Sequence, residues 1–177
     1  MKRVPVDREV HVHYHQLYVE SDPDEFTGPD LGEAFAGQAV GLCGGARSGA
    51  LYLMTGLHTG NVGFAVELHE DAQSVDDAWE EIVEVSFTPS SSRTALVQWA
   101  GEARWELDLE ETDYRVRYCA DGMDQGKLAD CRPHGEPQLD RYLLQFWPSP
   151  PQPARVLKQT SEIAAYWHQF ARERAAG

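Results

Sequence analysis

Alternation of apolar and polar residues along much of the chain is the feature that most constrains its fold. Side chains on a strand point to opposite faces in turn, so a period of two predicts a strand with one buried face. Six segments carry this pattern: ALYLMTG, VGFAVELHE, EEIVEVSF, TALVQWA, ARWELDLE and DYRVRYC. In the third, Glu84 falls on the face predicted to be solvated, and in the sixth Arg115 and Arg117 fall opposite the apolar face. Such alternation is typical of antiparallel sheets.

Four further elements complete the predicted fold. Residues 10–19 and DRYLLQFW, which ends before Pro148, are predicted strands. A short helix is predicted near residues 31–42 with Asp30 as its N-cap, and a C-terminal helix follows Thr160 or Ser161. The fold class is therefore mainly β: an antiparallel β-sandwich or jelly roll decorated by two helices.

The 177 residues suffice for one domain. We expect a β-sandwich domain over residues 1–147. Residues 148–177 supply a Pro-rich spacer, SPPQPA, and the C-terminal helix, which we expect to pack on the same domain. Residues 120–139 are predicted to form a long surface loop.

The formal net charge of −14 narrows the classes of partner. Nucleic acid and anionic membranes attract positive charge, so direct binding to either is disfavoured, whereas a basic protein would be attracted. The N-terminal MKRVPVDREV lacks the apolar core of a signal peptide, and no stretch has the ~20 apolar residues of a membrane helix. Three cysteines without CxxC spacing indicate free thiols, so we expect a cytoplasmic protein.

Two acidic runs are the leading candidates for a partner-binding site. Between residues 67 and 84 the chain has no Lys or Arg, and a second acidic run spans residues 108–113. These runs either keep turns solvated or form a docking surface for a basic protein. The candidate residues are Glu70, Asp71, Asp76, Asp77, Glu80, Glu81, Glu110, Glu111 and Asp113. Asp76, Asp77, Glu80 and Glu81 are the hypothetical phosphate mimics within this set.

The stretch VHVHYHQLYV supports an alternative hypothesis, a divalent transition-metal site. His13, His15 and Glu20 resemble the HxHx(3–4)E part of the first cupin motif. The cupin glycine is replaced by Asp7, and a second cupin motif is not recognisable. Under the other interpretations the histidines are structural or sense pH, and no cofactor is expected. A third hypothesis is a carbohydrate-binding sandwich that uses Trp79, Trp99, Trp105 or Trp147.

A resemblance to a known family covers roughly residues 9–120. It rests on VHYHQLYV, then DLGEAFAGQAVGLCGGARSGALYL, then VEVSF and WELDLEETDYRVRY, in this order. Together these segments resemble the ComJ-like family of competence-associated DNA-entry nuclease inhibitors. The resemblance implies a small β-sandwich that binds and blocks a nuclease and has no catalytic residues of its own. The chain after Cys119 extends past this pattern.

Overall fold

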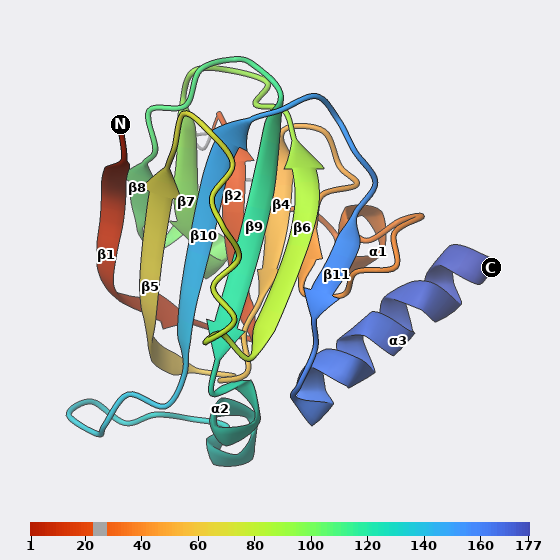
Figure 1. Cartoon of the computed structure of the whole chain (residues 1–177). Coiled ribbons are helices and arrows are strands. Elements are labelled where there is room, and N and C mark those ends of the chain that lie inside the picture. The colour runs from red at the N-terminus through yellow and green to blue at the C-terminus, as the bar shows by residue number, and fades with distance from the viewer. Residues whose placement is uncertain (23–27) are drawn as a thin grey trace.

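Two β-sheets packed face to face make up most of the protein (Figure 1). The computed structural model describes residues 1–22 and 28–177. The six-stranded sheet runs in the order β1 (Arg3–Val12), β5 (Gly60–Leu68), β10 (Arg141–Pro148), β9 (Tyr114–Asp121), β6 (Glu81–Phe87) and β11 (Arg155–Lys158). The five-stranded sheet runs in the order β3 (Cys43–Gly44), β4 (Ala50–Met54), β2 (Gln16–Ser21), β7 (Thr94–Gln98) and β8 (Arg104–Glu106). The helices are α1 (Leu31–Ala34), the 3-10 turn η2 (Trp99–Gly101), α2 (Met123–Ala129) and α3 (Glu162–Ala176).

The inner faces of the two sheets share one hydrophobic core. Alternate residues of β5, from Val62 to Leu68, enter this core together with Leu17 and Val19 of β2 and Leu96 of β7. The predicted mainly β fold is therefore confirmed. One pairing departs from the antiparallel expectation: β10 lies parallel to β5, because α2 and the following loop return the chain beside β5.

The histidine stretch was predicted to lie within a single strand over residues 10–19, and this prediction is wrong. β1 ends at Val12 in one sheet, and β2 begins at Gln16 in the other. Between them Tyr14 and His15 have positive φ angles of 54° and 61°, and the Gln16 amide donates to the His13 carbonyl over 3.1 Å. A reversal that uses two consecutive left-handed residues without glycine has no sequence signature.

The helix predicted near residues 31–42 is shorter than expected. Asp30 is the N-cap, as predicted, and its Oδ1 accepts from the Gly32 amide over 2.8 Å. The helix ends at Ala34, and the side chain of Gln38 then holds the following turns by donating to the Val40 and Cys43 carbonyls. The predicted loop over residues 120–139 is also corrected, since it contains the end of β9 and all of α2.

Two segments cross the outer face of the six-stranded sheet, and we call them the straps. The acidic strap, residues 69–80, runs in front of β10 and β9 (Figure 1). The proline strap, residues 149–154, leads into β11, which pairs with β6 and was not predicted. Arg117 donates to the Gln73 and Ser74 carbonyls, and Arg115 donates to the Gln152 and Pro153 carbonyls. The predicted spacer is thus bound to the sheet.

A buried ion cluster lies beneath the straps. Glu84 on β6 is 1% exposed, and its carboxylate accepts from Arg117 over 2.9 Å, Arg115 over 3.2 Å and Arg155 over 2.7 Å. Burial alone would raise the pKa of Glu84, but hydrogen bonds from these three guanidinium groups outweigh it and hold the pKa below its usual value. Glu84, Arg115 and Arg117 are therefore internal, although the alternation placed Glu84 on a solvated face.

Helix α3 is held at both its start and its middle. The Ser161 hydroxyl caps it by accepting from the Ala164 amide, and the Asp124 carboxylate of α2 accepts from the Glu162 and Ile163 amides at 3.0 Å each. Further along, the Gly41 amide donates to His168 Nδ1 over 2.9 Å. His168 is 2% exposed, and burial lowers its pKa to about 4.

Stability should fall as the pH drops from about 6.5 to about 4, because the unfolded chain binds a proton on His168 that the folded protein excludes. This one group accounts for about 3 kcal/mol at the acid end of that window. His168→Gln retains an acceptor for the Gly41 amide and removes the titration. Urea unfolding at a series of pH values should give the variant a smaller slope in that window than wild type. Equal slopes would contradict the assignment.

Candidate protein-docking surface

The acidic candidate residues lie at two opposite ends of the six-stranded sheet. The acidic strap starts where β5 ends at Leu68 and finishes where β6 begins at Glu81. β5 and β6 run in the same direction, because β5 is parallel to β10 and two antiparallel pairings then follow. The strap therefore spans the sheet from end to end. It separates Glu70 and Asp71 from the other four candidate carboxylates of the same acidic run. These four are Asp76, Asp77, Glu80 and Glu81.

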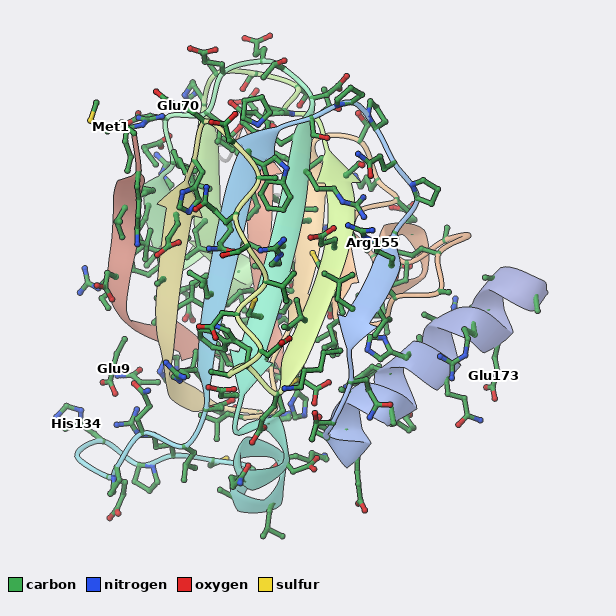
Figure 2. All side chains as sticks on the ribbon, viewed as in Figure 1. Met1, Glu9, Glu70, His134, Arg155 and Glu173 are labelled. Carbon is green, nitrogen blue, oxygen red and sulfur yellow. The ribbon has the colours of Figure 1, made fainter. Side chains whose placement is uncertain are left out.

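The first group forms what we call the acidic end. Glu70 and Glu110 line one depression of about 290 Å³, with Arg3 and Tyr114 on its walls. The members are Glu70, Asp71, Glu110, Glu111 and Asp113. The two predicted runs thus meet in space. Figure 2 shows Glu70 beside Met1 at this end, far from Glu9 and His134 at the other.

The acidic end is built by local hydrogen bonds that leave most carboxylates exposed. The Glu110 amide donates to the Tyr114 hydroxyl over 3.1 Å, and Thr88 donates to the Asp113 carboxylate over 2.6 Å. Glu70 is paired with the ammonium group of Met1, which lowers the pKa of the Glu70 carboxyl. Glu70 therefore stays ionised throughout the neutral range, as an electrostatic contact to a basic partner requires.

The carboxylates of the second group, Asp76, Asp77, Glu80 and Glu81, mostly accept hydrogen bonds from backbone amides of the protein itself. The Glu80 carboxylate accepts from the Gly122 amide over 3.0 Å, and Asp76 accepts from the Ala78 amide over 3.0 Å. Glu81 is fully buried, and its carboxylate accepts from the Thr160 and Ser161 amides before α3. Glu81 cannot contact a docked partner, so this member of the predicted set is corrected to a structural role. Asp77 remains exposed.

The predicted metal ligands do not converge. His15 Nδ1 contacts the Thr55 and Gly56 carbonyls, while His13 Nε2 lies 3.7 Å from Glu102. Glu20 is buried on β2, where burial raises its pKa. Among residues 1–22 and 28–177 no group of three or more His, Cys, Asp or Glu side chains could hold a metal ion.

Three of the four candidate tryptophans are covered by arginine side chains. Arg141 lies 4.3 Å from the ring centroid of Trp79, Arg117 lies 5.1 Å from Trp147 and Arg8 lies 5.6 Å from Trp105. Trp79 and Trp147 are also buried. The Trp79 and Trp147 rings therefore offer no open platform on which a sugar could stack. Trp99 instead lies among the rings of Tyr14 and His13.

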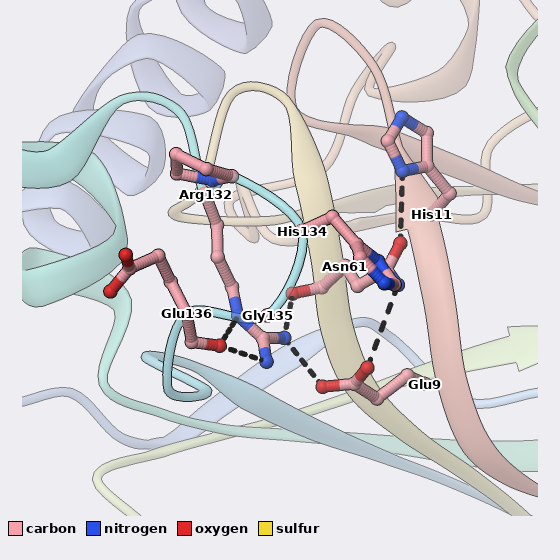
Figure 3. A pocket seen from close by; sticks show the side chains of 8 residues that line it. Glu9, His11, Asn61, Arg132, His134, Gly135 and Glu136 are labelled. Atoms are coloured by element: carbon pink, nitrogen blue, oxygen red, sulfur yellow. Dashed lines mark hydrogen bonds and ion pairs between the residues drawn. The ribbon is translucent and has the colours of Figure 1, made fainter.

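A pocket of about 380 Å³ lies beside the start of β5 (Figure 3). Arg132 lines this pocket and donates to the Glu9 carboxylate over 2.5 Å and to the Asn61 carbonyl over 2.7 Å. It also donates to the Glu136 carbonyl over 2.6 Å. His11 Nδ1 contacts Asn61 Oδ1 over 2.9 Å. The polar groups bind one another, so this network anchors the loop after α2 to the sheet.

Comparisons with known proteins identify the fold. No protein-family model and no curated protein sequence matches the chain. The crystal structure of ComJ, inhibitor of the DNA degrading activity of NucA, from Bacillus subtilis superposes with a TM-score of 0.57 at 16% identity, covering 84% of this chain and 99% of that chain. The chain has a ComJ-like fold. A second structure, described as crocagin biosynthetic gene J, gives 0.55 at 13% identity over 85% of this chain and 99% of the other.

The ComJ-like fold extends further along the chain than the sequence resemblance indicated. The superposed share of 84% is larger than the share that residues 9–120 make up. At such low identity the likeness establishes the fold, and no residue of ComJ carries over to a numbered position here. Within the described residues, no helix of this ComJ-like chain is long and apolar enough to cross a membrane.

Proposed function

We propose that this protein is a non-enzymatic inhibitor that binds a basic enzyme, specifically a nuclease, through its acidic end. The observation that carries the proposal is the pairing of a ComJ-like fold with two acidic runs that meet around one depression. ComJ is an inhibitor of a DNA-degrading activity, which supports the same class of role for this chain.

The charge distribution supplies the physical mechanism. A nuclease grips phosphate with positive side chains, so exposed carboxylates can occupy the same groups. The formal charge of −14 would accelerate encounter with such an enzyme, since electrostatic steering raises association rates by about 10- to 1,000-fold. Direct binding of this chain to nucleic acid is disfavoured for the same reason.

The cytoplasm is the location we propose for this activity. All three cysteines are free: Cys43 and Cys119 are buried, and Cys131 is exposed. Burial raises the pKa of the Cys119 thiol to about 12, so it stays protonated and unreactive at neutral pH. Unpaired thiols suit a reducing compartment.

Neutralising the acidic end should slow association with the target by about tenfold or more at low salt, because steering depends on local charge. The variant combines Glu70→Gln, Asp71→Asn, Glu110→Gln and Glu111→Gln. A matched control carries the same change in net charge at exposed sites elsewhere: Glu33→Gln, Glu136→Gln, Glu162→Gln and Glu173→Gln. Each protein is immobilised through a C-terminal handle, exposed to lysate of the native host and eluted with salt.

DNase activity in the eluate identifies the target, and its association rate with each variant is then measured at several salt concentrations. Wild type and control should retain the nuclease and suppress its activity, while the acidic-end variant should not. Equal rates for all three proteins would remove the acidic end from the proposal. The inhibitor role itself would be wrong if wild type retained no nuclease and suppressed no DNase activity.

A further inference from the structure

Of the six described residues other than glycine that have a positive φ, Asp22 and Asp108 lie at the acidic end and the other four lie at the opposite end of the sheets. Tyr14 and His15 form a left-handed pair in the turn between β1 and β2, and Ala100 in η2 has a φ of 56°. Asp130 has a φ of 63° and a ψ of −53°, and the Cys131 amide donates back to the Ala129 carbonyl over 2.7 Å. Residues other than glycine in such conformations cost of order 1–3 kcal/mol each and cluster where a protein binds ligands.

The strained segments bring a set of rings together at the surface. The Tyr14 ring lies 5.1 Å from Trp99 and 5.2 Å from His58, measured between centroids, and His13 lies 5.7 Å from Trp99. The interplanar angle of Tyr14 and Trp99 is 52°, so the rings form a tilted wall rather than a flat platform. Tyr14 is 51% exposed although it is aromatic and strained. Burial therefore does not account for its place in the turn.

The carboxylate of Glu102 lies beside these rings. Glu102 follows η2, its side chain is 48% exposed, and it lies 3.7 Å from His13 Nε2. An aromatic face beside a carboxylate is suited to a guanidinium group, which stacks on the ring and donates to the acid. The protein uses this chemistry internally, since arginines cover Trp79, Trp105 and Trp147. In the described part of the chain no guanidinium lies over Trp99.

We propose that Tyr14, Trp99 and Glu102 form a binding site for an arginine side chain of a basic protein. The tilted rings take the flat face of the guanidinium, and Glu102 accepts its N–H groups. Arg132, at the same end of the sheets, is already bound to Glu9 and the Glu136 carbonyl. The site goes beyond the proposed nuclease inhibition, and it is tested without the nuclease.

The probe is acetyl-arginine methylamide, titrated into the ¹⁵N-labelled full-length protein and followed through the indole N–H signal of Trp99. We expect a saturable shift, with no shift for the uncharged isostere acetyl-citrulline methylamide. Tyr14→Asn and Glu102→Gln should each weaken binding by about fivefold to tenfold. Asparagine tolerates the left-handed conformation, so the first variant should keep the fold.

Two control variants make the test specific. Tyr166→Asn removes a ring that is 57% exposed on α3, and Glu173→Gln removes an exposed carboxylate from the same helix. Both should bind the probe as wild type does. The proposal would be overturned by no saturable shift of Trp99, by equal shifts with the citrulline isostere, or by unchanged affinity in Tyr14→Asn. A Trp99 shift with methyl glucoside alone would instead identify a carbohydrate site and also overturn it.

Discussion

Replacing Glu84 with glutamine is expected to lower the free energy of unfolding by about 3–5 kcal/mol, the cost of leaving buried charges without their partner. Arg115 and Arg117 are 2% and 5% exposed, and both depend on this carboxylate for charge compensation. For a protein of this size the loss corresponds to roughly 6–20 °C in Tm. Glutamine keeps the shape of the side chain, so the effect reports on charge rather than on a cavity.

Thermal unfolding of the purified proteins, monitored by circular dichroism, measures this effect. Glu106→Gln is the control, because Glu106 is an exposed strand carboxylate whose loss should change Tm very little. The triple replacement Glu84→Leu, Arg115→Leu, Arg117→Met removes all three buried charges and should be more stable than Glu84→Gln. If the Glu84→Gln protein had the same Tm as wild type, the buried arginines would not need the carboxylate.

Gly41→Ala is expected to detach α3 from the sheets at a cost of about 2–4 kcal/mol, from steric overlap and the lost hydrogen bond. A Cβ at this position would lie 2.0 Å from the Trp167 carbonyl oxygen and 2.6 Å from the His168 amide nitrogen. Both atoms belong to the helix backbone, so no side-chain rotation can relieve the contact. The bond from the Gly41 amide to His168 would break as the helix moves.

Limited trypsin digestion reports directly on the helix, because Lys158, Arg172 and Arg174 flank or lie within it. Gly41→Ala should lose the C-terminal segment much faster than wild type. The matched control is Gly37→Ala, which strains a φ of 70° but has nothing within 4 Å of its Cβ. That control should be slightly less stable while α3 stays protected. Equal digestion rates for Gly41→Ala and wild type would contradict the close packing.

Strands in which apolar and polar residues alternate could be predicted from the sequence. Most of their apolar residues face the one core that the two sheets share. β5, β6, β8 and β9 fall where apolar and polar residues alternate, whereas every residue of β4 and β7 is buried. β11 was missed because it is four residues long and follows a proline run. The reversal at Tyr14 was missed because left-handed residues in turns are usually Gly or Asn, and here neither occurs.

Candidate site residues were harder to predict, because alternation identifies faces of a sheet but not what covers them. Glu84 and Arg117 alternate as solvated residues do, yet the straps bury both. Sequence proximity also misled in the acidic run, where the strap carries Glu70 and Glu81 to opposite ends of the sheet. The meeting of Glu70 with Glu110 depends on tertiary packing that no local pattern encodes.

The position of β10 has a consequence for how the protein is made. Along the chain β10 follows every other strand of its sheet except β11, yet it occupies the middle of that sheet between β5 and β9. Until it arrives, both neighbours present open hydrogen-bonding edges in a nascent chain that is already apolar on one face. The newborn protein therefore passes through a window in which aggregation competes with insertion of one strand, and chaperone dependence should be greatest there.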